Sequence, residues 1–203
     1  MKGIDMDDAR DEQLEQMRRS LQLRPDEVRM NDLFPVFVPD AFFQFGNWPG
    51  PYERLRIQGL GLTWAIERPA QTMLYVTPPL EQHWNSKGLD WRGIALANVR
   101  QKSERRPWTH EFHREAGGLY AVAMMHEDGY GPSRLLLREL FEGLFPGGYR
   151  IALPEMSVGY AMSAALPPDE EAKMQDLVQQ NFVTGTRPLV PGIFPSEELM
   201  RAR

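Results

Sequence analysis

The stretch "THEFHREAGGLYAVAMMHEDGYGPSRLLLRELFEGLF", residues 109–145, contains one full copy of the order of elements that decides the fold. Two segments with strand-like composition, 109–115 and 119–127, lie on either side of an Ala-Gly-Gly turn. Glycine readily adopts the positive φ angles that tight hairpin turns require. A helical segment follows over residues 132–145 and stops at Pro-Gly-Gly. The stretch therefore predicts an antiparallel strand pair followed by a helix.

The same order of elements is predicted on both sides of this stretch. The segments are strands over 60–67 and 72–78 with a helix over 91–102, and strands over 149–154 and 158–166 with a helix over 167–182. Strands joined by short turns pair antiparallel, and each helix has an apolar stripe that must be covered. We therefore predict an α+β fold in which three strand–strand–helix units form a mainly antiparallel sheet with the helices on one face.

Residues 1–56 are predicted to form a separate N-terminal part, and residues 57–203 the α+β domain with an extended C-terminal tail. The N-terminal part begins with a helix over residues 5–23. An arm over residues 33–52 follows, in which aromatic residues are interleaved with so many prolines that long regular elements are not expected. Its aromatic side chains are Phe34, Phe37, Phe42, Phe43, Phe45, Trp48 and Tyr52. They are expected either to fill one face of the core or to bind a protein partner or a second copy of the chain.

Composition places the chain among ordinary soluble proteins, with 203 residues, of which 42% are hydrophobic and 25% charged. No apolar run approaches the roughly 20 residues that a membrane-spanning helix needs, and the acidic first residues differ from a secretory leader. The chain has no cysteine, which excludes disulfides, thiolate nucleophiles and cysteine-ligated metals. We therefore expect a cytoplasmic protein with no membrane contact.

The net charge of −5 argues against a nucleic-acid partner. Proteins that bind nucleic acids usually present a basic face to the phosphates. The basic cluster at residues 100–106 is interrupted by Glu104 and is typical of a solvated helix end. We expect no nucleic-acid binding.

A histidine and two carboxylates crowd the predicted strand-to-helix corner at residues 126–134. In a structural interpretation, Asp128 bonds to free helix amides, Ser133 or Gly131 caps the helix, and Arg134 forms a salt bridge with Asp128. In a functional interpretation, the helix start holds an anion and His126 beside Asp128 acts as a base. The catalytic candidates are His126, Asp128 and Arg134. No glycine-rich phosphate loop and no Gly-x-Ser-x-Gly elbow indicates a particular reaction.

Two further polar features bear on binding. Asn98 lies within the apolar stripe of the helix predicted over residues 91–102, where a buried amide must find hydrogen-bond partners. It is expected either to tie the helix to a neighbouring backbone or to line a pocket. His110 and His113 lie on a predicted strand, whose two-residue period sends them to opposite faces. We therefore expect no metal site there, and no cofactor.

Three segments of the chain carry a family resemblance: "DWRGIALANVRQ" (90–101), "EDGYGPSRLLLREL" (127–140) and "YRIALP" (149–154). Their order and approximate spacing resemble the YtpQ-like family of uncharacterised bacterial proteins, over roughly residues 60–195. The resemblance implies a cytoplasmic α+β protein and implies no reaction. The residues at its motif positions are Asn98, Asp128, Gly129, Ser133 and Arg134.

The missing catalytic signatures favour a non-enzymatic protein-interaction or regulatory domain, with the aromatic arm over residues 33–52 as a binding surface. The alternative is a small-molecule or anion-binding hydrolase whose site is the corner at residues 126–134. The predicted binding residues are Asn98, Asp128, Ser133 and Arg134. Whether the chain is an enzyme stays open from its sequence.

Overall fold

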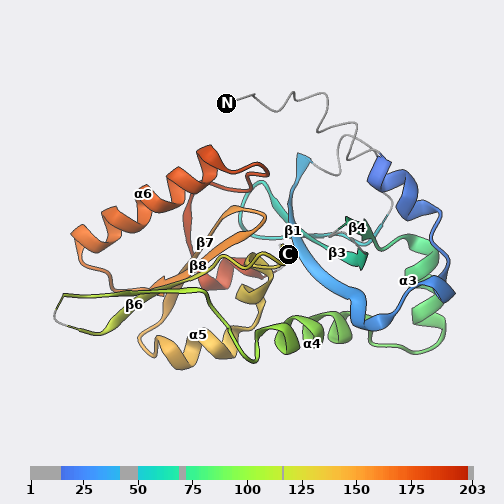
Figure 1. Cartoon of the computed structure of the whole chain (residues 1–203), viewed down its shortest axis with the longest axis horizontal. Helices are drawn as coiled ribbons and strands as arrows, with labels where there is room; N and C mark the ends of the chain where they lie inside the picture. Colours follow the sequence, from blue (N-terminus) through green and yellow to red (C-terminus); the bar gives the residue numbers. More distant parts are fainter. Residues whose placement is uncertain (1–14, 42–49, 69–71, 116, 201–203) are drawn as a thin grey trace.

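A computed structural model describes residues 15–41, 50–68, 72–115 and 117–200, and has two antiparallel sheets side by side with helices packed against them (Figure 1). The predicted α+β class is confirmed, with the strands divided between two sheets. The strands are β1 (Leu33–Pro39), β2 (Glu53–Arg54), β3 (Leu60–Arg68), β4 (Thr72–Tyr75), β5 (His110–His113), β6 (Leu119–Met124), β7 (Tyr149–Glu155), β8 (Val158–Ser163) and β9 (Ile193–Pro195).

Helices connect and cover these strands. The α-helices are the one at residues 15–21, α3 (Pro78–Ser86), α4 (Trp91–Ser103), α5 (Arg138–Leu144) and α6 (Pro168–Thr184). The 3-10 helices are η1 (Pro25–Glu27), η2 (Met30–Asp32), η4 (Pro132–Leu136) and η5 (Ser196–Leu199). None of the helices in the described ranges is both long enough and apolar enough to cross a membrane.

All three predicted strand pairs form, as β3 with β4, β5 with β6, and β7 with β8, each antiparallel. In the first sheet, β3 is central: β1 pairs along one edge, and β2 and β4 share the other edge. The second sheet has the strand order β5-β6-β8-β7-β9. Asp90 caps α4 as predicted, since its Oδ1 accepts a hydrogen bond from the Gly93 amide at 3.0 Å.

The prediction that prolines exclude regular structure from the arm is wrong for residues 33–39, which form β1. The even-numbered residues of β1 exchange hydrogen bonds with β3, a register that continues to Asp40, whose amide donates to the Gly59 carbonyl at 2.9 Å. Pro35 and Pro39 therefore turn their nitrogens toward the outer edge. A proline is tolerated there because the ladder needs no N–H from it.

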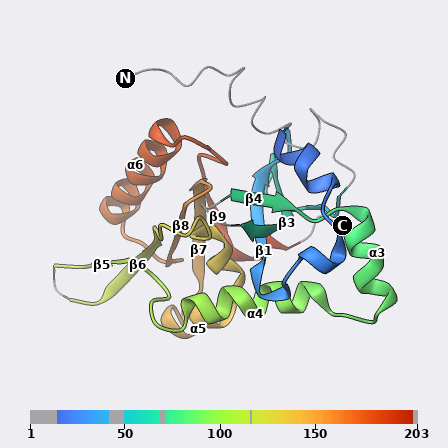
Figure 2. The same cartoon turned by 45° about the vertical axis from the view of Figure 1, so that its right-hand side comes forward.

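One continuous core joins the two sheets. Leu33 and Phe37 of β1 belong to it together with Ile151 of β7 and Ala161 of β8. The opposite face of the second sheet is covered by α6, seen at the upper left of Figure 1 and in the rotated view of Figure 2. Two sheets that share a core leave their loops close together, and this closeness creates the site described below.

The aromatic side chains of the arm lie partly in the core and partly outside the described ranges, and Tyr52 is half-buried with its hydroxyl donating to the Asp40 carboxylate. Phe34 is 1% exposed and Phe37 is 2% exposed, so these two side chains fill the core. The predicted positions Phe42, Phe43, Phe45 and Trp48 lie outside the described residues, as does the first part of the helix predicted over residues 5–23.

The helix predicted over residues 132–145 is interrupted after its first turns. It forms as the 3-10 helix η4 followed by α5, and Leu137 at the junction has φ −85° and ψ 66°. Both Leu135 and Leu137 are completely buried, which a single regular α-helix would not achieve on one narrow face. The interruption turns η4 toward β1 and β8, with which it is in contact.

Candidate functional site

The strand-to-helix corner follows directly from β6. Gly129 has a φ of 74°, in the left-handed region that glycine adopts without strain, so the chain reverses there. The Tyr130 amide donates to Asp128 Oδ1 at 3.0 Å and closes the turn. Both η4 and the loop before it are thereby fixed against the end of the strand.

Asp128 and Arg134 form a two-point ion pair at this corner. Arg134 Nη2 donates to Asp128 Oδ2 at 2.7 Å, and Nη1 donates to Oδ1 at 3.2 Å. The Arg134 side chain is 1% exposed and that of Asp128 is 24% exposed. Partial burial acts to raise the pKa of Asp128, but the hydrogen bonds from Arg134 and from the Tyr130 amide outweigh it and hold the pKa below its ordinary value.

Ser133 and Asn98 both bond to the backbone near β1. Ser133 Oγ donates to the Pro35 carbonyl at 2.6 Å, so this hydroxyl links the corner to the first sheet and does not cap η4. Asn98 Nδ2 donates to the carbonyls of Met30 at 2.7 Å and Leu33 at 2.9 Å. Of the two roles open to Asn98, the tie between α4 and a neighbouring backbone is the one observed.

His126 is half-buried on the same loop. Its Nε2 donates to the Arg106 carbonyl at 2.8 Å, which leaves Nδ1 as an acceptor without a hydrogen-bond partner in the described part of the chain. Burial lowers the pKa of His126, and the nearby Arg134 guanidinium lowers it further. The imidazole is therefore neutral near pH 7.

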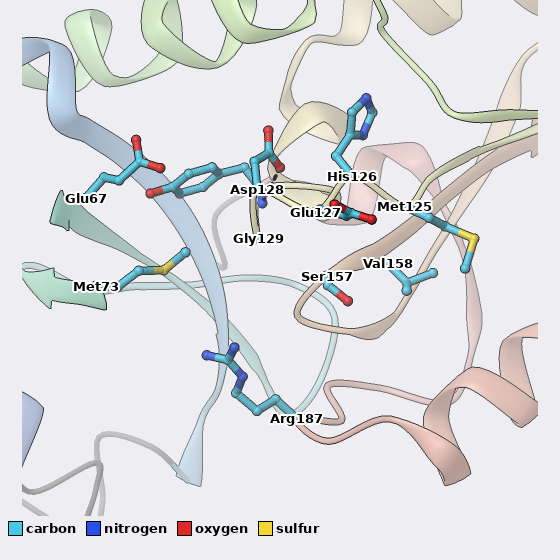
Figure 3. Close-up of a pocket in the computed structure, with 11 residues that line it drawn as sticks. Glu67, Met73, Met125, His126, Glu127, Asp128, Gly129, Ser157, Val158 and Arg187 are labelled. Carbon is cyan, nitrogen blue, oxygen red and sulfur yellow. Dashed lines mark hydrogen bonds between the residues drawn. The ribbon is translucent and has the colours of Figure 1, made fainter. Parts of the chain in front are cut away.

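A cavity of about 310 Å³ lies beside the corner, where loops of the two sheets meet (Figure 3). Its lining comes from the ends of β3 and β4, from the loop after β6, from the β7–β8 turn and from the segment after α6. The lining residues are Glu67, Met73, Met125, His126, Glu127, Asp128, Gly129, Tyr130, Ser157, Val158 and Arg187. Arg134 does not line the cavity, so the three catalytic candidates do not converge there.

Tyr130 lies directly behind the wall of the cavity. The residue is 0% exposed, and its ring stacks on Phe34 with a centroid distance of 4.3 Å. Its hydroxyl has no hydrogen-bond partner in the described residues. Burial, followed by the nearby Glu67 carboxylate, raises the pKa of Tyr130. An unpaired buried hydroxyl costs free energy, and because Tyr130 is fully buried its hydroxyl is closed to a ligand in the cavity.

Two charged residues that line the cavity already have partners. Glu67 accepts from Lys102 Nζ at 3.1 and 3.3 Å, and Asp128 is held by Arg134. Glu127 and Arg187 are both exposed, and neither side chain has a hydrogen bond or ion pair within the described ranges. The unpaired charges at the cavity are thus one negative and one positive.

The sequence pointed to one wall of this cavity only. His126 and Asp128 were singled out because they stand beside a turn, but Glu67 and Arg187 lie far from them in the chain. No local pattern connects residues that meet through the packing of two sheets. Tyr130 carried a usable signal, since a large aromatic residue inside a polar turn is expected to be buried.

The histidines of β5 remain apart from this site. His110 Nδ1 lies 2.9 Å from Thr109 Oγ1, and His113 Nε2 lies 3.0 Å from Glu111 Oε2. Both histidines are exposed. Within residues 15–41, 50–68, 72–115 and 117–200, no group of three or more His, Asp or Glu side chains is placed to hold a metal ion.

No protein-family model matches the chain, and no curated protein or solved structure is significantly similar to it. Membership of the YtpQ-like family therefore stays a prediction from the quoted segments.

Proposed function

We propose that this protein is a non-enzymatic binding domain that recognises a ligand, or a segment of a protein partner, in the cavity between its two sheets. The observation that carries this proposal is the pair of opposite charges, Glu127 and Arg187, that line the cavity without an ion pair in the described residues. At the corner, by contrast, Asp128 pairs with Arg134 and the Ser133 hydroxyl donates to backbone. The polar atoms of the corner that lack a partner among the described residues are His126 Nδ1 and Arg134 Nε.

The shape and lining of the cavity also support a binding role. Its volume of about 310 Å³ is at the lower end of the range typical of small-molecule sites. Met73, Met125 and Val158 provide apolar surface, and methionine side chains adapt to ligands of different shape. Apolar surface combined with polar groups that can fix the orientation of a ligand is the usual composition of a specific pocket.

The proposal is tested by solution NMR of the full chain with four small probes: n-butanol, n-butylammonium, butyrate and ε-aminocaproate. At least one probe is expected to shift the backbone amides of Gly129, Ser157 and Val158 saturably. The control compares two exposed methionines. Met125 lines the cavity and is 38% exposed, whereas Met200 lies elsewhere and is 41% exposed.

The bulky Met125→Trp substitution should weaken the binding, and Met200→Trp should leave it unchanged. Saturable shifts that survive Met125→Trp, or the absence of saturable shifts with all four probes, would contradict the proposal. Thermal unfolding of both variants verifies that each one is folded.

The remaining parts of the proposal rest on the sequence. A protein partner or self-association through the arm over residues 33–52 is supported by its aromatic side chains at 42–48, which lie outside the described residues. A cytoplasmic location is supported by the absence of cysteine. Light scattering after size exclusion tests the self-association, for which a strictly monomeric chain at high concentration is the contrary result.

A second candidate, a small-molecule hydrolase, is favoured by one observation at His126. This neutral imidazole lines the cavity and has a free Nδ1 acceptor, as a general base requires. In Figure 3, however, its ring points away from Arg187 on the opposite side of the cavity. Turnover of p-nitrophenyl acetate that is lost in His126→Gln would support this candidate, and equal rates in both chains would exclude it for that substrate.

A further inference from the structure

We infer that the ligand of the cavity carries both an ammonium and a carboxylate group, as an amino acid does. This inference rests on the binding role proposed above and gives it a chemical class. It is drawn from the two unpaired charges at the cavity and from their placement on different walls.

The charges that line the cavity are neutralised in pairs except for two. Lys102 and Arg134, which neutralise Glu67 and Asp128, do not line the cavity themselves. Glu127 and Arg187 remain, with no ion pair in the described part of the chain. A ligand with a single charge can satisfy one of them, whereas a dipolar ligand can satisfy both.

The two unpaired residues reach the cavity from different elements. Glu127 belongs to the loop after β6, and Arg187 to the segment after α6. Figure 3 shows Arg187 entering from below, whereas Glu127 and Asp128 lie on the upper wall. A molecule held between these walls would present its ammonium to Glu127 and its carboxylate to Arg187, whose planar guanidinium suits carboxylate geometry.

The rest of the lining fits the carbon chain of such a ligand. Met73 and Val158 offer apolar contact between the charged walls. The methionine side chain adapts to ligands of different shape.

The test extends the NMR titration to a comparison of dissociation constants for ε-aminocaproate, norleucine, n-butylammonium and butyrate. The tighter of the two amino acids is expected to bind about threefold or more tightly than either singly charged probe, since an exposed charge pair contributes modestly. Norleucine and ε-aminocaproate differ in the separation of their two charges, so their order reveals which kind of amino acid fits.

Two variants test which residue binds each charged group of the ligand. In Glu127→Gln, the tighter-binding amino acid should lose its higher affinity relative to butyrate. In Arg187→Gln, it should lose its higher affinity relative to n-butylammonium. The matched controls are Glu115→Gln and Arg56→Gln, which change exposed residues that do not line the cavity. All four variants should unfold at the same temperature as the parent chain.

The possible results distinguish a failure of this inference from a failure of the proposed binding role. Singly charged probes that bind as tightly as the amino acids, or affinities that do not change in Glu127→Gln and Arg187→Gln, overturn the inference while the binding role stands. Titrations in which no probe binds at the cavity overturn both.

Discussion

The hydroxyl of Ser133 donates to the carbonyl oxygen of Pro35 across 98 residues of sequence, at a distance of 2.6 Å. Ser133 is 2% exposed, so the bond is shielded from water. It joins the corner that follows the second sheet to the outer edge of the first sheet. The relative position of the two sheets, and with it the shape of the cavity, therefore depends in part on a single buried hydrogen bond.

Ser133→Ala is expected to lower the free energy of unfolding by about 1–2 kcal/mol, because the Pro35 carbonyl is left buried without its donor. Urea denaturation measures the change. Ser86 provides the control: its hydroxyl also donates to a backbone carbonyl, that of His83, but in an exposed position. Ser86→Ala should change stability by less than about 0.5 kcal/mol. Equal losses of unfolding free energy in the two variants would show that the buried hydrogen bond between the sheets stabilises the fold no more than an exposed one.

Asn98→Ala should destabilise the fold by about 2 kcal/mol, since two backbone carbonyls lose their shared donor. Asn98→Asp should cost more, because a carboxylate would face the carbonyl oxygens of Met30 and Leu33 in a buried site. Gln101→Ala on the exposed face of the same helix is the control. If chemical denaturation shows that Asn98→Asp lowers the free energy of unfolding less than Asn98→Ala does, the amide does not act as the buried donor described here.

The ion pair between Asp128 and Arg134 should show strong coupling in a double-mutant cycle. Asp128→Leu alone leaves the buried guanidinium without its counter-charge and should cost about 3 kcal/mol. Replacing both residues, with Arg134→Met beside Asp128→Leu, should cost less than the sum of the single changes, because no buried charge remains. Additive free energies from denaturant unfolding would mean that the two side chains act independently.

His126 should make stability depend on pH. Its pKa is lowered in the folded chain by burial, so between that value and the unfolded value of about 6.5 the unfolded chain binds more protons. Stability therefore falls as pH decreases through about 6.5. His126→Gln keeps a donor for the Arg106 carbonyl and removes the titration, so its denaturation profile should be flatter between about pH 5 and 7. Superimposable profiles for the two chains would refute the effect.

Local patterns were sufficient to predict the repeated order of elements. Glycine-containing turns, an Asp90 cap and apolar stripes are all short-range features, and they correctly indicated three antiparallel strand pairs with a helix after each. The salt bridge between Asp128 and Arg134 could also be predicted, because the two residues are only six positions apart in the sequence. Interactions of this kind are fixed by neighbours in sequence.

Long-range features were not predictable in the same way. The division of the strands into two sheets depends on which apolar faces meet, and the sequence contains several equivalent faces. The partner of Ser133 was missed because a cap is the common local role of serine, whereas its observed acceptor is a proline carbonyl of β1. The cavity was not predicted because it also depends on long-range packing: Glu67, Glu127 and Arg187 line one cavity only once both sheets have packed.

The outer edge of β1 has a consequence for how this protein meets other chains. Pro35 and Pro39 offer no N–H there, and the carbonyls of Leu33 and Pro35 already accept bonds from Asn98 and Ser133. An extended strand from another molecule would find few free groups to pair with, so β-augmentation is blocked on this side of the first sheet. The same side chains that hold the fold together thus also protect it from edge-to-edge aggregation.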